Sequence, residues 1–126
     1  MAAPDQRHTL SKEERLHGKK DIAGLLSKGK FRVCREFRYC FRPDNGLPYS
    51  RIMISVPKKL FRRAVKRNAV KRRVRESYRL QKGLLPEGHG ADILFIYNSR
   101  EIAATREIFS SVGRILNEIS HEIGKN

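Results

Sequence analysis

Apolar and polar positions along the chain follow two periods, one typical of helices and one typical of strands. Residues 21–28 carry a short helical pattern with its apolar side chains on one face, and Gly29 follows as a helix-ending residue. Residues 60–82 contain neither glycine nor proline and predict a long helix. The last segment predicts an amphipathic helix of about six turns. Its apolar positions are Ile102, Phe109, Val112, Leu116, Ile119 and Ile123.

Between these helices, apolar residues alternate with polar ones. Residues 31–42 predict strand structure with one buried face, and Arg35 interrupts it, so one strand or two are expected. The apolar positions of this run are Phe31, Val33, Phe37, Tyr39 and Phe41. Residues 51–56 alternate again after a turn signal, PDNG, at 43–46, which predicts an antiparallel pair or meander. Residues 91–97, ADILFIY, predict a central strand covered on both faces.

The order of these elements predicts an α+β fold. We expect a single domain over residues 1–126, with an αβββαβα order and helices packed on a mixed central sheet. A chain of 126 residues that is 39% hydrophobic can build one modest core but not two. Residues 1–12 are polar and contain a proline, so we expect a flexible tail there.

Targeting signals and cysteine usage point to a cytoplasmic protein. The chain has no apolar run of 18 residues, so no membrane span is predicted, and its first ten residues lack the apolar region of a signal peptide. Two cysteines, Cys34 and Cys40, are too few for a disulfide framework, and we expect both to be reduced.

The basic charge is concentrated in one fifth of the chain. The formal net charge is +15. Residues 58–82 hold 12 of the 28 basic side chains and one acid, Glu76, whereas residues 83–126 hold four basic and six acidic side chains. Such clustering is the electrostatic footprint of a phosphate-binding surface, and it predicts a nucleic-acid partner.

Within residues 62–80, the predicted helix carries two rows of side chains. At 100° per residue, Val70, Val74 and Tyr78 form an apolar core stripe. A cationic face lies beside it and consists of Arg67, Asn68, Lys71, Arg72, Arg75 and Arg79. Guanidinium groups on a rigid helix can hold successive phosphates with paired hydrogen bonds. The helix therefore predicts a binding surface for a nucleic-acid backbone.

The elements around this helix favour RNA over DNA. A helix-turn-helix protein needs a second helix a few residues upstream, where this chain has a predicted strand that closes at Pro57. A basic leucine zipper needs apolar heptads downstream, where residues 83–90, GLLPEGHG, end the helix.

Residues 66–76, KRNAVKRRVRE, closely resemble the RNR signature of bacterial ribonuclease P proteins, roughly R-N-x-x-K-R-x-x-R-E. The preceding SVPKKLFRRAV resembles the family's strand, double lysine and helix entry. Arg15, Leu16 and residues 21–29 resemble its N-terminal helix, and ADILFIY resembles its last strand. About 110 residues are covered, and the family's fold resembles a domain of a small-subunit ribosomal protein.

The resemblance implies the protein subunit of a ribonucleoprotein endonuclease that removes the 5′ leader from precursor tRNA. In this family, the hydrolysis is carried by a catalytic RNA, which is also expected to bind most of the Mg²⁺. The partners implied are that RNA and precursor tRNA, with no membrane and no obligate protein partner. By position, the implied RNA contacts are Arg67, Asn68, Lys71, Arg72 and Arg75, flanked by Lys58, Lys59, Arg63 and Arg79.

The family holds the single-stranded leader in a cleft between the N-terminal helix and the sheet. The positions implied for this cleft are Ile22, Leu26, Phe37, Tyr39 and Cys40. The family often has phenylalanine where Ile22 stands, and a cleft-side aromatic of some members falls at Cys40. Stacking on leader bases is therefore expected to be weaker here or to be carried by Tyr39. The family often has an arginine directly after the last strand, where this chain has Asn98, and Arg100 follows two residues later.

No catalytic set stands out in the chain. Its four histidines are scattered, and the basic segment has no paired carboxylates. Glu76 is expected to pair within its helix with Arg72, Arg73 or Arg79. Three alternatives remain open: a ribosomal or other structural RNA-binding protein of similar fold, a self-sufficient metal-dependent nuclease, and a dimeric DNA-binding regulator.

Overall fold

A computed structural model describes residues 10–123 and confirms the α+β class and the αβββαβα order. Its elements are the 3-10 turn η2 (Lys12–Glu14), α1 (Lys19–Lys28), β1 (Lys30–Cys34), β2 (Phe37–Arg42), β3 (Arg51–Ser55), α2 (Ala64–Gln81), η3 (Lys82–Leu84), β4 (Asp92–Tyr97) and α3 (Thr105–Ile123). Most of the expected flexible tail, residues 1–9, lies outside the described residues. Of its last three residues, Leu10 packs on the core and Ser11 is the N-cap of η2.

The four strands form one mixed sheet in the order β1-β2-β4-β3. β2 pairs with β1 and β4 antiparallel, and β3 pairs with β4 parallel. The expectation that residues 51–56 pair with the preceding run is wrong, because β4 lies between β2 and β3. A parallel pair needs a long crossover connection, and α2 provides it between β3 and β4. The prediction of a central, buried strand at 91–97 is confirmed.

A two-residue turn at positions 35–36 divides the first strand run into β1 and β2. Arg35 has a positive φ of 53°, and Cys34 pairs directly with Phe37 across the turn. This pairing places the odd-numbered residues of β1 on the opposite face from those of β2. Phe31 and Val33 are therefore 43% and 71% exposed, and the prediction that they share a buried face with β2 is wrong.

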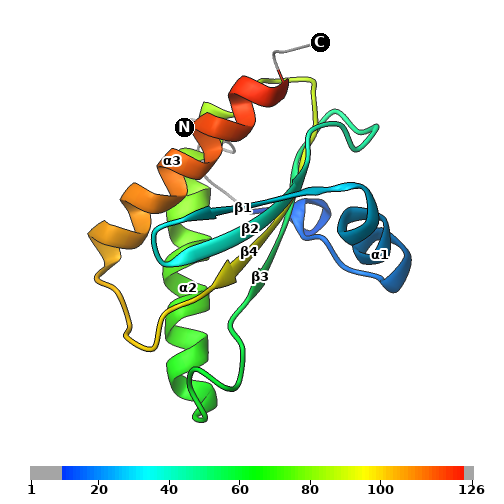
Figure 1. Ribbon diagram of the computed structural model, residues 1–126. Helices are drawn as coiled ribbons and strands as arrows, with labels where there is room; N and C mark the ends of the chain where they lie inside the picture. The colour runs from blue at the N-terminus through cyan, green and yellow to red at the C-terminus, as the bar shows by residue number, and fades with distance from the viewer. Residues whose placement is uncertain (1–9, 124–126) are drawn as a thin grey trace, which may run out of the picture.

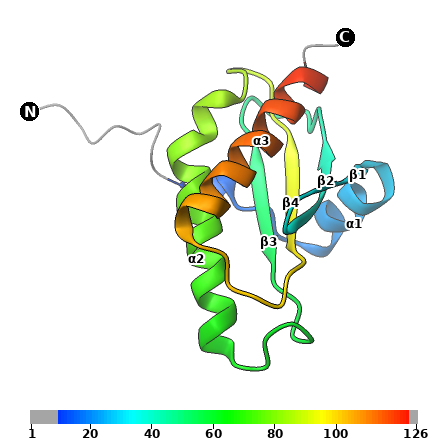
Figure 2. The same ribbon diagram turned by 60° about the vertical axis from the view of Figure 1, so that its left-hand side comes forward.

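Helices lie on both faces of the sheet (Figure 2), and the two apolar clusters that they cover differ in size. On one face, α2 and α3 cover a core to which β2 and β4 contribute Phe37, Tyr39, Phe41, Ile93, Phe95 and Tyr97. On the other face, α1 covers a small cluster around Leu25, Cys40 and Leu94. Gly29 ends α1 as predicted, and a Cβ atom there would lie 2.7 Å from the Cys40 Sγ, so the close approach of α1 to β2 requires glycine.

The two long helices bury the stripes that their periodicity predicts, with one difference. On α2, Val70, Val74 and Tyr78 are at most 1% exposed, as predicted. The predicted stripe of α3 is shifted, because Phe109 is 41% exposed whereas Ile108 and Ile115 are fully buried. No helix among residues 10–123 combines the length and apolar character that crossing a bilayer requires.

Candidate nucleic-acid interface

The first turns of α2 and the loop that leads into it extend beyond the end of the sheet (Figure 1). Lys58 and Lys59 lie in a turn after β3 that a hydrogen bond from Leu60 N to Pro57 O closes, and both lysines are exposed. Arg63 is also exposed and occupies the N-cap of α2. The loop cations and the start of the cationic face are therefore presented at one protruding end of the molecule.

The cationic face of α2 divides into exposed and half-buried side chains. Asn68, Arg72 and Arg75 are exposed, and Lys71 is half-buried. Among the residues that the structure describes, none of Lys71, Arg72 and Arg75 forms an ion pair with an acid. These three cations lie on one rigid helix, and no protein carboxylate within the described residues competes with phosphate for them.

Arg67 has a second role that the helical pattern does not indicate. Its Nη1 donates hydrogen bonds to Phe61 O at 2.7 Å and to Arg62 O at 2.9 Å. The side chain thereby holds the loop before α2 against the helix. Arg73 acts similarly at the other side of the helix, where its Nη1 donates to Ala103 O at 2.6 Å.

We expect Arg67→Ala to lower the free energy of unfolding by about 1–2 kcal/mol, because the two loop carbonyls lose their donor. Arg75→Ala, a matched change on the same face, should alter it by less than about 0.5 kcal/mol. Urea unfolding of both variants measures the difference. Equal stabilities for the two variants would show that the Arg67 hydrogen bonds do not hold the loop.

Arg79 is paired within its own helix. Its Nε donates to Glu76 Oε2 at 3.2 Å, and a second, shorter hydrogen bond joins its Nη2 to Oε1. The guanidinium lowers the pKa of the Glu76 carboxyl through this hydrogen bonding. The prediction that Glu76 pairs within the helix is confirmed, with Arg79 as its partner. The Arg79 charge is consequently less available to an external phosphate than that of Arg75.

A groove beside α2 brings further cations to the same surface. Lys71 and Arg75 line a hollow of about 290 Å³ together with Arg15 and His17, over a floor that includes Ile52 and Met53. The N-terminal segment is held there by a hydrogen bond of 2.7 Å from Leu16 N to Ile52 O. Arg15 and His17 are not among the predicted binding residues, because their approach to α2 depends on this long-range pairing.

The residues predicted for a cleft beside the N-terminal helix do not lie together. Phe37 and Tyr39 are at most 1% exposed and belong to the core under α2 and α3, on the far face of the sheet from α1. Tyr39 donates a 2.5 Å hydrogen bond to Glu118 of α3, and burial raises the pKa of its hydroxyl. Neither ring can reach a ligand beside α1, so their assignment to the cleft is wrong.

The other three predicted cleft residues do lie on the α1 side of the sheet. Cys40 is fully buried beneath α1, with its Sγ 3.6 Å from Leu25 O, and burial raises the pKa of its thiol. It therefore cannot contact a ligand as the structure stands. Ile22 is half-buried against this cluster, and Leu26 is 46% exposed. Only these two of the five predicted residues can border a cleft.

On this same face, α1 leaves part of the sheet open. It packs on the row of paired residues that contains Cys40 and Leu94. The next row consists of Val33, Arg38, Ile96 and Ser55. Val33 is 71% exposed, Arg38 is exposed and Ile96 is half-buried. We call this row, together with Phe31, the open row; it ends three residues before Lys58.

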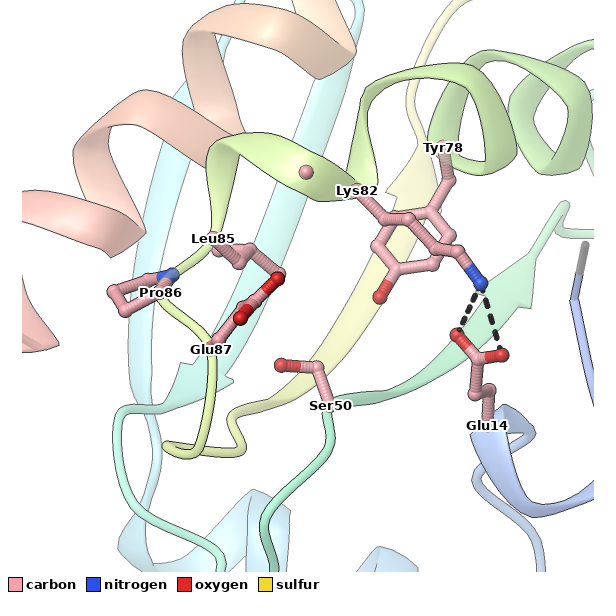
Figure 3. A pocket seen from close by; sticks show the side chains of 8 residues that line it. Glu14, Ser50, Tyr78, Lys82, Leu85, Pro86 and Glu87 are labelled. Carbon is pink, nitrogen blue, oxygen red and sulfur yellow. Dashed lines mark hydrogen bonds and ion pairs between the residues drawn. The ribbon is translucent and has the colours of Figure 1, made fainter. Parts of the chain in front are cut away.

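A separate hollow lies at the C-terminal end of α2 (Figure 3). Its volume is about 240 Å³. Lys82 and Glu14 both line it, and the Lys82 Nζ donates hydrogen bonds of 2.9 and 3.0 Å to the Glu14 carboxylate of η2. The ring of Tyr78 forms part of its wall. No residue of the cationic face lines this hollow, so it is distinct from the basic surface. Within residues 10–123, no three His, Cys, Asp or Glu side chains gather to hold a metal ion.

Comparison with known proteins defines the class to which this fold and surface belong. The family profile described as Ribonuclease P matches residues 10–120. The chain belongs to the family of bacterial ribonuclease P protein components, which confirms the resemblance of the RNR segment.

Individual relatives agree with this assignment. A ribonuclease P protein component of Porphyromonas gingivalis W83 is 43% identical over 98 residues, which cover 76% of this chain and 66% of the relative. The matched stretch thus spans just under two thirds of that relative's length. One from Thermotoga maritima is 40% identical over 80 residues, covering 64% of this chain and 67% of the relative.

Solved structures show the same fold. The ribonuclease P protein from Thermotoga maritima superimposes with a TM-score of 0.72 and 32% identity, over 83% of this chain and 96% of that one. A ribonuclease P protein from Staphylococcus aureus superimposes with a TM-score of 0.71 and 27% identity, over 83% and 94% of the two chains.

Proposed function

We propose that this chain is the protein subunit of a ribonuclease P ribonucleoprotein. It binds the catalytic RNA through the cationic face of α2 and assists the endonucleolytic removal of the 5′ leader from precursor tRNA. The observation that carries this proposal is the set of exposed cations on one rigid, protruding helix. Arg72 and Arg75 are exposed there beside the neutral Asn68, and Lys58 and Lys59 continue the surface into the preceding loop.

We assign the phosphodiester hydrolysis to the RNA subunit and its Mg²⁺ ions. Among the described residues, no cluster of metal-ligating side chains accompanies the cationic face. The residues present suit a different task, because arginine and lysine bind phosphates and offset the repulsion between RNA strands. The protein's contribution is then to position the two RNA molecules and to neutralise charge between them.

We further propose that the single-stranded leader binds along the open row of the sheet. Val33, Arg38 and Ile96 offer apolar and cationic contacts there, and Lys58 lies just beyond the end of the row. The arrangement supports one continuous path from the leader site to the cationic face of α2. Precursor tRNA and catalytic RNA are thus the expected partners, without an obligate protein partner. The free thiols of Cys34 and Cys40 favour a cytoplasmic location.

Reconstitution with a bacterial ribonuclease P RNA tests the proposed function. We expect the protein alone to leave precursor tRNA intact. Together with the RNA subunit, it should lower the Mg²⁺ concentration needed for 5′ processing, because its cations replace part of the ionic screening. Gel analysis of the cleaved leader measures both outcomes. Cleavage by RNA-free protein would instead establish a self-sufficient nuclease, and co-purification with a ribosomal subunit would favour a ribosomal role.

A further inference from the structure

An exposed aromatic ring lies on the sheet face that α1 only partly covers. Phe31 projects from β1, is 43% exposed and pairs across the sheet with the buried Cys40. Among the described strand residues on this face, it is the only aromatic one. The strands of this face therefore offer one ring for stacking, on β1, which holds none of the predicted cleft residues.

A cation already stacks on this ring. The Arg38 guanidinium carbon lies 4.8 Å from the centroid of the Phe31 ring. Arg38 is itself exposed, and none of the acids within the described residues forms an ion pair with it. A guanidinium plane held over a ring is a surface on which a nucleobase can stack, and its charge attracts the adjacent phosphate.

The charges near the Phe31–Arg38 pair favour a negatively charged ligand. Among the described strand residues, the acidic side chain on this face is Asp92. Its carboxylate accepts hydrogen bonds of 2.8 and 2.9 Å from Arg51. From β1 to β3 the open row spans three inter-strand spacings, or about 14 Å. Lys58 follows beyond its far end. A short single strand crossing the row would thus meet a stacking site first and a cation last.

We propose that Phe31 and Arg38 form a base-stacking platform for the single-stranded 5′ leader of precursor tRNA. The inference rests on the proposed function. It names residues that stack in place of Tyr39 and of the aromatic residues that the family often has at the positions of Ile22 and Cys40. Tyr39 lies on the other face of the sheet and Cys40 is buried. Stacking is sequence-tolerant, so the platform recognises an unpaired base and not a particular one.

Substrate binding by the reconstituted holoenzyme tests the platform. We expect Phe31→Ala to weaken binding of precursor tRNA with a leader of several nucleotides by about five- to a hundredfold. Binding of a substrate with a single-nucleotide leader should not change. Phe31→Tyr, which keeps a ring, should retain the wild-type affinity. Phe109→Ala, a control that removes a ring of similar exposure (41%) from α3, should change the affinity by less than about twofold.

A fluorescent adenine analogue in the leader reports stacking directly. We expect its fluorescence to be quenched on binding to the wild-type holoenzyme, less quenched with Arg38→Gln and least quenched with Phe31→Ala. Thermal unfolding verifies that the variants are folded. If Phe31→Ala unfolds, Phe31→Leu preserves the apolar volume and carries the same test.

The outcomes distinguish a failure of the stacking platform from a failure of the proposed function. If the wild-type holoenzyme discriminates leader length and Phe31→Ala discriminates equally with full quenching, the platform is wrong and the proposed function stands. If the wild-type protein neither stimulates processing nor favours the longer leader, the proposed function fails, and the platform fails with it.

Discussion

Affinity for the catalytic RNA should fall about 10³-fold when the monovalent salt concentration rises from about 50 to 200 mM. Each phosphate contact releases counterions and contributes roughly −0.7 to −0.9 to the slope of log K against log salt. Arg67 and Arg79 are engaged within the protein. Of the cations predicted to contact RNA, the remaining six are Lys58, Lys59, Arg63, Lys71, Arg72 and Arg75.

Six contacts predict a slope between about −4 and −5. Binding titrations at several salt concentrations and constant Mg²⁺ measure it, since a changing Mg²⁺ level would alter the RNA fold as well. A slope shallower than about −2 would mean that this surface is not the main contact with RNA.

Arg51→Met should lower the free energy of unfolding by about 3 kcal/mol, because it leaves a buried carboxylate without its cation. Asp92 is 1% exposed, and both of its oxygens accept hydrogen bonds from the Arg51 guanidinium, at 2.9 and 2.8 Å. Asn45 supplies one further hydrogen bond of 2.9 Å to the carboxylate. Arg51 also contacts Asp21 at 3.2 Å, so the same side chain joins β4, β3 and α1.

A double variant distinguishes the unpaired charge from a general packing defect. Arg51→Met combined with Asp92→Leu removes both partners, and such a replacement is often close to neutral. We therefore expect the double variant to be more stable than Arg51→Met alone in urea unfolding. Equal losses in the single and double variants would contradict the assignment of the cost to the buried Asp92 charge.

The long helix shows what local sequence information predicts well. The stripe of Val70, Val74 and Tyr78 is fully buried, and Asn68 and Arg75 are exposed as their helical phase requires. Burial on a helix follows from a period of 3.6 residues, which neighbouring positions specify without reference to distant segments. The RNR segment could be recognised for the same reason, since its residues are contiguous.

The sheet shows where local information ends. Alternation from Phe31 to Phe41 predicts one face, but the two-residue turn that begins at Arg35 reverses which positions of β1 point inward. The position of β4 between β2 and β3 likewise depends on a crossover that no short pattern encodes. The cleft positions came instead from the resemblance to the family; the structure places Phe37 and Tyr39 in the core under α2 and α3, whereas Phe31 lies on the α1 face of the sheet.

Hydrogen bonds from side chains to backbone carbonyl oxygens could not be predicted from the sequence either. Arg67 has the helical phase of a binding residue, yet its guanidinium holds the carbonyl oxygens of Phe61 and Arg62. The folded loop before α2 creates those acceptors, and no residue type in the sequence identifies them. The helical phase thus predicts which cations lie at the surface of α2, but not which of them the protein's own backbone engages.

Removing two charges from the cationic face, and two from elsewhere, tests the central claim most directly. Arg72 and Arg75 are exposed on α2, and Arg106 and Arg114 are exposed on α3. Both double alanine variants lose the same net charge. We predict that the α2 pair makes the salt slope for binding the catalytic RNA shallower by about 1.4 to 1.8, and that the α3 pair leaves it unchanged. Equal changes from both pairs would show that the RNA responds to total charge, and would contradict a specific interface on α2.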